Sequence, residues 1–342
     1  MPFIANGRAT GIGSLPHQDV TDAVAAVFRD CPDLPYWPQL PNASKAEGMN
    51  EQAAVGLPGL TMTDGRLRLV QDEAFFEDAE RLLAAYEAGN AAFAALPPEA
   101  ACGFEPFLDE VARRGCPEAK GQIAGPITVG MNIRGDDGNP ILYNEVLCDV
   151  LTKFLNLRVR WQAQRIAETG ATPIVFVDEP FLASYGTPFF GWDKPKVQET
   201  LAAVTAGAET TGSHCCSNTE WSIFLGGPVQ AVSFDAYEFA QNFLVYRDDL
   251  RAFLEGGGTI VWGIVPTDPD AVAAATVDSL HALMDTHLAT VEALGFSREQ
   301  VLRQSLVTPA CGLGTRPTET AEAAFRLTRD LADRLQREYL GT

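Results

Sequence analysis

The chain has 342 residues, of which 46% are hydrophobic and 20% charged, and this composition is typical of a globular protein with a large core. Its formal net charge of −20 repels phosphate backbones and anionic lipid head groups, so we expect no nucleic-acid or membrane partner. We find no basic-then-apolar leader and no apolar run near the roughly 18 residues of a membrane span. Seven cysteines are too few for a disulfide framework, so we expect a cytoplasmic protein.

Short apolar runs typical of buried strands recur along the chain, and helical stretches lie between most of them. The eight predicted strands are Thr10–Ser14, Tyr36–Leu40, Lys120–Ala124, Ile174–Asp178, Thr210–His214, Ala231–Asp235, Thr259–Ile264 and Gln304–Thr308. The predicted helices include Val20–Arg29, Ala74–Leu96, Tyr143–Thr169, Lys196–Ala208, Asp268–Leu294 and Thr318–Tyr339. Alternating strands and helices indicate a parallel sheet with right-handed crossovers. Eight such units favour an α/β fold consisting of a single (β/α)8 TIM barrel over residues 1–342.

The segment from Pro41 to Cys116 is too long for one strand–helix unit. We therefore expect extra helices inserted after the second strand, above the mouth of the barrel. Pro97 and Pro98 interrupt the helical pattern within this segment.

Chemically active side chains gather where the predicted strands end. In (β/α)8 barrels the active site lies at the carboxyl ends of the strands. The residues at or just beyond those ends are Ser14, Asp178, His214, Cys216, Asp235 and Cys311. This placement predicts a functional site at that face of the barrel.

His214 and Cys216 are two residues apart, so in an extended chain their side chains point to the same side. Cys311 after the last strand adds a second thiolate, and Asp235 after the sixth adds a carboxylate. One imidazole, two thiolates and one carboxylate form a tetrahedral set that suits Zn2+. Zinc deprotonates a coordinated thiol, and a weakly held carboxylate could give way to a substrate sulfur. For the other five cysteines we expect core packing.

Two further strand ends predict contacts to an amino-acid substrate. Asp178 could hold a substrate ammonium, or it could be a solvent-exposed carboxylate at the start of a helix. Gly11 and Gly13 beside Ile12 and Ser14 would let backbone N–H groups approach an anion such as a carboxylate.

Five motifs together resemble a known family. They are Ile12-Gly13-Ser14-Leu15-Pro16, Gly125-Pro126-Ile127-Thr128, Val177-Asp178-Glu179-Pro180, His214-Cys215-Cys216 and Pro309-Ala310-Cys311-Gly312-Leu313. Their order is similar to that in the catalytic domain of cobalamin-independent methionine synthase, one of the uroporphyrinogen decarboxylase-like barrels. The resemblance implies a catalytic zinc site at His214, Cys216 and Cys311 with an acidic fourth ligand, either Asp235, which we prefer, or Glu238. It also implies that the backbone of Ile12 and Ser14 holds the carboxylate of homocysteine, that Asp178 holds its amine, and that Glu47 is a further acidic contact.

The sequence departs from the family on the side of the methyl donor. The resemblance implies a short form without the N-terminal barrel of the full-length synthases. Asn132 stands where a folate-stacking aromatic residue is expected, Ser184 where an acid is expected, and Val265 where a proton-donating histidine is expected. We therefore predict a zinc-dependent methyltransferase that methylates homocysteine from a non-folate donor, such as a methylcorrinoid, free or on a partner protein.

Two other functions remain open from the sequence. One keeps the zinc chemistry but methylates another thiol, such as coenzyme M; Asp178 favours an acceptor with an ammonium group. The other is a zinc-binding barrel without catalysis, and the retention of both metal and acceptor residues argues against it.

Overall fold

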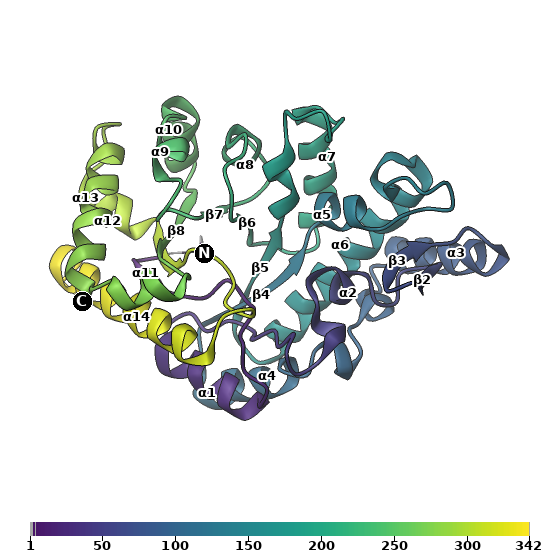
Figure 1. The fold of residues 1–342 in the computed structure, drawn as a ribbon, viewed down its shortest axis with the longest axis horizontal. Helices are drawn as coiled ribbons and strands as arrows, with labels where there is room; N and C mark the ends of the chain where they lie inside the picture. Colours follow the sequence, from purple (N-terminus) through teal and green to yellow (C-terminus); the bar gives the residue numbers. More distant parts are fainter. Residues whose placement is uncertain (1–2, 4, 342) are drawn as a thin grey trace.

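The computed structural model describes residue 3 and residues 5–341. Its centre is a curled parallel sheet of seven strands in the order β1-β9-β8-β7-β6-β5-β4 (Figure 1). The strands are β1 (Arg8–Ala9), β4 (Glu118–Ala124), β5 (Thr172–Asp178), β6 (Thr211–Cys215), β7 (Ala231–Phe234), β8 (Thr259–Val265) and β9 (Ser305–Pro309). Every neighbouring pair is parallel, which confirms the predicted α/β class with a parallel sheet.

Helices alternate with these strands and lie around the sheet (Figure 1). They are α1 (Val20–Asp30), α4 (Phe104–Arg114), α5 (Pro126–Asn132), α6 (Glu145–Glu168), α7 (Lys194–Thr205), α8 (Ser222–Leu225), α9 (Ala240–Leu244), α10 (Arg247–Glu255), α11 (Pro269–Ala274), α12 (Val277–Glu292), α13 (Arg298–Arg303) and α14 (Thr318–Tyr339). The predicted helix Asp268–Leu294 is divided in two, because Thr276 forms a capping box with Ser279 and begins α12. Within the part of the chain that the structure describes, no helix combines the length and apolar character needed to cross a bilayer.

The second predicted strand, Tyr36–Leu40, does not form a regular strand, so the sheet has seven strands where the sequence predicts eight. The segment instead makes isolated parallel bridges, from Tyr36 to Lys120 and from Gln39 to Ser14. Pro38 has no N–H group to donate, which accounts for the interrupted ladder. Through these bridges the segment lies between β4 and the chain that follows β1.

The segment between Pro41 and Cys116 contains α2 (Met49–Ala54), α3 (Glu73–Glu87), three short 3₁₀ turns and a hairpin of β2 (Leu60–Thr63) and β3 (Arg66–Leu69). The sequence analysis missed the hairpin, although its two-residue Asp-Gly turn is a strong signal: both turn residues have positive φ. In Figure 1, α2 lies near β4, whereas the hairpin and α3 lie at the right-hand edge of the molecule.

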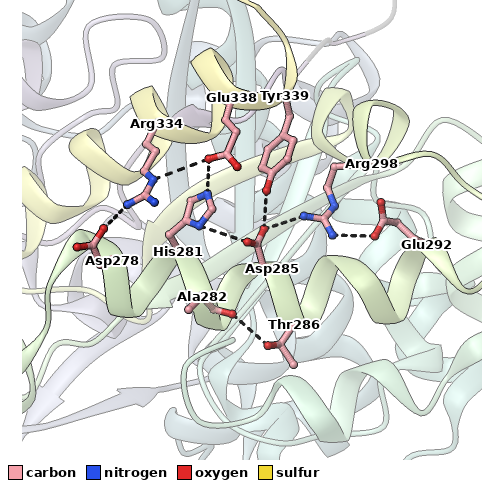
Figure 2. A network of polar contacts seen from close by, with 10 residues as sticks. All are labelled: Asp278, His281, Ala282, Asp285, Thr286, Glu292, Arg298, Arg334, Glu338 and Tyr339. Carbon is pink, nitrogen blue, oxygen red and sulfur yellow. Dashed lines mark hydrogen bonds and ion pairs between the residues drawn. The ribbon is translucent and has the colours of Figure 1, made fainter.

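The last helix, α14, is joined to α12 and α13 by a polar network (Figure 2). The His281 ring lies between two carboxylates, with Nδ1 3.3 Å from Asp285 and Nε2 2.9 Å from Glu338. The Tyr339 hydroxyl donates to Asp285 at 3.0 Å, and Arg298 pairs with the same carboxylate at 2.7 Å. This network holds α14 on the outer side of the sheet, where it packs against β9 and β1.

The two ends of the sheet interior differ in chemistry. Near the amino ends of the strands, the interior is filled by an apolar cluster that includes Leu34, Ile174, Phe176, Val261 and Leu306. The carboxyl ends carry the polar side chains predicted to form the site.

Candidate metal centre and acceptor cavity

Three predicted metal ligands meet at the carboxyl ends of β6 and β9. His214 lies in β6, and Cys216 is the first residue after that strand. Cys311 lies two residues beyond the end of β9. One ligand atom from each of these residues lies within 4.8 Å of the other two. We call this group the His–Cys–Cys triad; the close approach predicted from the sequence is present.

The His214 ring has one nitrogen fixed and one free. Its Nδ1 lies 2.8 Å from the Ser233 hydroxyl on the neighbouring strand β7. Its Nε2 is buried and has no hydrogen-bond partner among the described residues. A buried polar atom without a partner is costly, and a metal ion bound at Nε2 would satisfy it.

The two cysteines of the triad shift each other's pKa in opposite directions. The neighbouring Cys311 thiol and the His214 ring lower the pKa of Cys216 far below that of a free thiol. The neighbouring Cys216 thiolate, together with burial, raises the pKa of Cys311. A buried nitrogen and two sulfur atoms within 4.8 Å of one another form a set of donors that fits zinc.

Asp235, the preferred fourth ligand, follows β7 but does not join the triad. Its Oδ1 accepts the backbone N–H of Glu238 at 2.9 Å, so this oxygen is engaged in a local turn. Burial raises the pKa of Asp235 to about 6, and its charge acts on both His214 and Cys311. The alternative ligand, Glu238, is exposed to solvent.

A cavity of about 420 Å³ opens beside the triad. Its lining includes His214, Cys216 and Cys311 together with Ile12, Ser14, Glu47 and Asp178. The cavity therefore brings together every residue predicted to bind metal or acceptor except Asp235.

Asp178 presents an available carboxylate to this cavity from the end of β5. Its Oδ1 is buried and has no hydrogen-bond partner among the described residues. Burial raises the pKa of Asp178, whereas His214 and Lys120 lower it. The short helix that follows has no side-chain cap, so Asp178 is not the helix-start carboxylate of the alternative interpretation.

Ser14 connects the first strand end to the loop that carries Cys311. Its carbonyl accepts the N–H of Leu313 at 2.9 Å, and its hydroxyl accepts the N–H of Gly314 at 3.2 Å. A Cβ atom on Gly312 would collide with the same hydroxyl, so a larger residue there would displace the Ser14 side chain. The predicted acceptor contact and the predicted metal ligand are therefore parts of one packed unit.

Glu47 lines the cavity, but its carboxylate is occupied by backbone donors. It accepts the N–H groups of Leu40 and Cys102 and is almost fully buried. Its direct role in this structure is to fix the loop that follows Gln39.

The sequence analysis missed Glu179, which joins two of the motifs. The buried Glu179 carboxylate accepts the N–H of Ile127 at 2.9 Å, the N–H of Thr128 at 2.7 Å and the Thr128 hydroxyl at 2.6 Å. A Cβ atom on Gly125 would collide with this carboxylate. The Gly-Pro-Ile-Thr and Asp-Glu-Pro motifs therefore lock together and fix the chain next to Asp178.

The three donor-side positions lack the groups expected of the family. The Asn132 side chain donates to the carbonyl of Thr128 at 2.8 Å, within its own helix. Val265 is a fully buried aliphatic residue at the end of β8. Ser184 lines a second cavity of about 660 Å³, together with Phe181 and other residues.

Comparisons with known proteins place the chain in a family and show which solved structures it is similar to. The family model described as "Cobalamin-independent synthase, Catalytic domain" matches residues 118–334. The structure of a B12-independent methionine synthase from Shewanella sp. W3-18-1, in complex with selenomethionine, is 14% identical, with 98% of this chain and 99% of that chain covered at a TM-score of 0.60. A methyltransferase from Methanosarcina mazei is 15% identical, with 97% and 94% of the two chains covered at a TM-score of 0.44. No curated protein sequence matches the chain.

Proposed function

Because this chain belongs to the family of cobalamin-independent synthase catalytic domains and is a methyltransferase of the methionine synthase kind, we propose that it methylates the thiol of homocysteine at a zinc site. The observation that carries the proposal is the cavity that joins the triad to the unpartnered carboxylate of Asp178. A thiol acceptor with an ammonium group matches both ends of this cavity.

In the proposed reaction the acceptor is held at three points. Asp178 pairs with the ammonium group, and backbone N–H groups between Ile12 and Ser14 hold the carboxylate. The acceptor sulfur faces the triad, where bound zinc would keep it as a thiolate at neutral pH. Asp235 is the proposed fourth ligand, supported by its position after β7 and the action of its charge on Cys311.

The proposed methyl donor differs from the one expected from the sequence. A corrinoid donor or partner is at odds with a family of cobalamin-independent synthases, and we do not retain it. We propose a methyl donor other than polyglutamyl folate. Asn132 and Val265 stand where the family resemblance implies a ring that stacks on folate and a group that donates a proton to it.

We further propose that the fold is a complete (β/α)8 barrel and a single domain over residues 1–342. The bridges from Tyr36 and Gln39 support this closure, because they fill the gap between β4 and the end of β1. The segment from Pro41 to Cys116 would then be the insertion after the second strand.

A donor-independent experiment tests the acceptor half. The protein is loaded with Co2+ in place of zinc, and the sulfur-to-cobalt charge-transfer absorption is followed while homocysteine, coenzyme M or 2-aminobutyrate is added. We expect homocysteine alone to increase the absorption, because it has both the thiol and the ammonium group that pairs with Asp178. An increase with coenzyme M alone would support the other acceptor, and no increase with either thiol would contradict the proposal.

Turnover is tested separately by detecting methionine by mass spectrometry. Homocysteine is combined with methyl-tetrahydrofolate, with methylcobalamin or with a cell extract as a source of donor. We expect a cell extract to support methionine formation by the wild type and by Cys215→Ser, a matched control whose thiol faces away and donates to the carbonyl of Ser217. Cys216→Ser should lose it, and equal activity in Cys216→Ser would contradict the site.

A further inference from the structure

A buried lysine contacts Ile12, one of the residues that line the acceptor cavity. Lys120 lies in β4 and is 2% exposed. Its Nζ lies 4.7 Å from the centre of the Phe176 ring and 5.9 Å from that of Tyr36. Burial lowers the pKa of Lys120 to about 8. A buried lysine is unfavourable unless it is paired, so its contacts indicate what it does.

The ammonium group of Lys120 ties the end of β1 to β4. Its Nζ donates to the carbonyl of Ile12 at 2.7 Å and to Oε1 of Gln122 at 3.0 Å. The turn from Gly11 to Gly13 needs such a tether, because β1 ends at Ala9 and both flanking residues are glycines. A Cβ atom on Gly11 would collide with the Tyr36 ring, so this turn also packs closely on the interior.

Fixing the Ile12 carbonyl also fixes the next amide. In a trans peptide the C=O and N–H groups point in opposite directions, so a carbonyl held toward Lys120 turns the N–H of Gly13 away from it. Within the described chain, the N–H groups of Gly13 and Ser14 have no hydrogen-bond partner. Two adjacent free amides at a cavity lined by Ile12 and Ser14 form a site for an anion.

We propose that Lys120 is a positioning residue for the acceptor: by holding the Ile12 carbonyl it aims the Gly13 and Ser14 amides at the acceptor's carboxylate. This inference rests on the proposed function. The charges agree with it, because the positive Lys120 donates to Ile12 at the proposed carboxylate end of the cavity and attracts Asp178 at the proposed ammonium end. The site is thereby matched to a zwitterionic amino acid.

The experiment compares Lys120→Met with Asn156→Leu. Asn156 is a matched control, because its buried side chain also donates to a backbone carbonyl, that of Ala203 at 2.8 Å, but on the outer helices. Each zinc-loaded protein is titrated with homocysteine and with 3-aminopropane-1-thiol, which is homocysteine without its carboxylate. Amide hydrogen exchange is followed over residues 10–16.

We expect Lys120→Met to weaken homocysteine binding by about tenfold or more, the size of one lost hydrogen bond to a charged group. Binding of 3-aminopropane-1-thiol and the zinc content should stay within about twofold of the wild type, because neither depends on the amides. Exchange at Leu15, whose N–H donates to the carbonyl of Gln39 at 2.8 Å and so reports on the order of this turn, should accelerate in Lys120→Met only. Unchanged exchange there, or an equal loss of binding for both thiols, would overturn the inference.

Two further results separate this inference from the proposed function. If the wild type binds neither thiol, the proposed function fails, and hydrogen exchange alone decides the role of Lys120. If Lys120→Met does not fold, a crystal structure of the wild type with homocysteine decides it. A carboxylate bound to the Gly13 or Ser14 amide supports the inference, and a carboxylate bound elsewhere overturns it.

Discussion

The buried Arg158 in α6 holds α2 in place, and its replacement gives a quantitative test of the packing around the cavity. Arg158 is fully buried and donates to the carbonyls of Ala94 at 2.8 Å, Gln52 at 2.7 Å, Ala53 at 3.2 Å and Val55 at 2.7 Å. Three of these carbonyls lie at the end of α2, where a helix leaves its last carbonyls without internal partners. Arg158 therefore caps the carboxyl end of α2.

The cost of Arg158→Met follows from two opposing contributions. Four hydrogen bonds to a charged group contribute together about 6–12 kcal/mol. Burial lowers the pKa of Arg158 from 12.5 to about 9, which corresponds to about 5 kcal/mol of unfavourable desolvation that the variant no longer bears. The difference between these contributions is about 1–7 kcal/mol, so we expect the variant to lose unfolding free energy with a central value of about 4 kcal/mol.

Urea unfolding followed by circular dichroism measures this loss, with Arg160→Met as the control. Arg160 lies two residues further along the same helix, and its buried Nε has no hydrogen-bond partner among the described residues, so we expect a change below about 1 kcal/mol. Hydrogen exchange in Arg158→Met should accelerate first at residues 49–55. A variant within about 1 kcal/mol of the wild type would refute the reasoning.

Three further predictions concern the site. Asp178→Asn should raise the KM for homocysteine strongly, because the substrate ammonium in a desolvated pocket loses a charged partner worth about 2–5 kcal/mol. An unchanged KM in steady-state assays would exclude Asp178 as the amine contact. Asp235→Ala should lower zinc affinity more than Glu238→Ala does, as measured by competition with a chelator, and the reverse order would make Glu238 the ligand. Methyl-tetrahydrofolate should support little methionine formation, because Asn132 and Val265 supply neither stacking nor a proton; rapid turnover would contradict this.

The parallel sheet was predictable because its buried strands are continuous apolar runs separated by long helical patterns. The second strand was not, because Tyr36, Trp37 and Leu40 supply the apolar pattern while Pro38 interrupts the hydrogen bonds. The hairpin at Asp64 and Gly65 was missed although its turn residues signalled it.

The triad and Asp178 were predictable because barrel chemistry gathers at strand ends and the spacing of His214 and Cys216 suits one metal. The engagement of Asp235 in a turn with Glu238 depends on backbone geometry that the sequence does not specify.

The roles of Glu179 and Lys120 were not predicted, because each depends on partners distant in sequence. Glu179 contacts a helix start about 50 residues earlier, and Lys120 contacts Ile12 more than 100 residues earlier.

Zinc content tests the central claim most directly. Elemental analysis of the purified wild type should give about one zinc per chain, and Cys215→Ser, which changes a neighbouring cysteine outside the triad, should retain it. Cys311→Ala should lose most of the zinc, because removing one of three strong ligands weakens binding severely. A wild type without zinc, or a Cys311→Ala variant with undiminished zinc, would contradict the proposed metal centre.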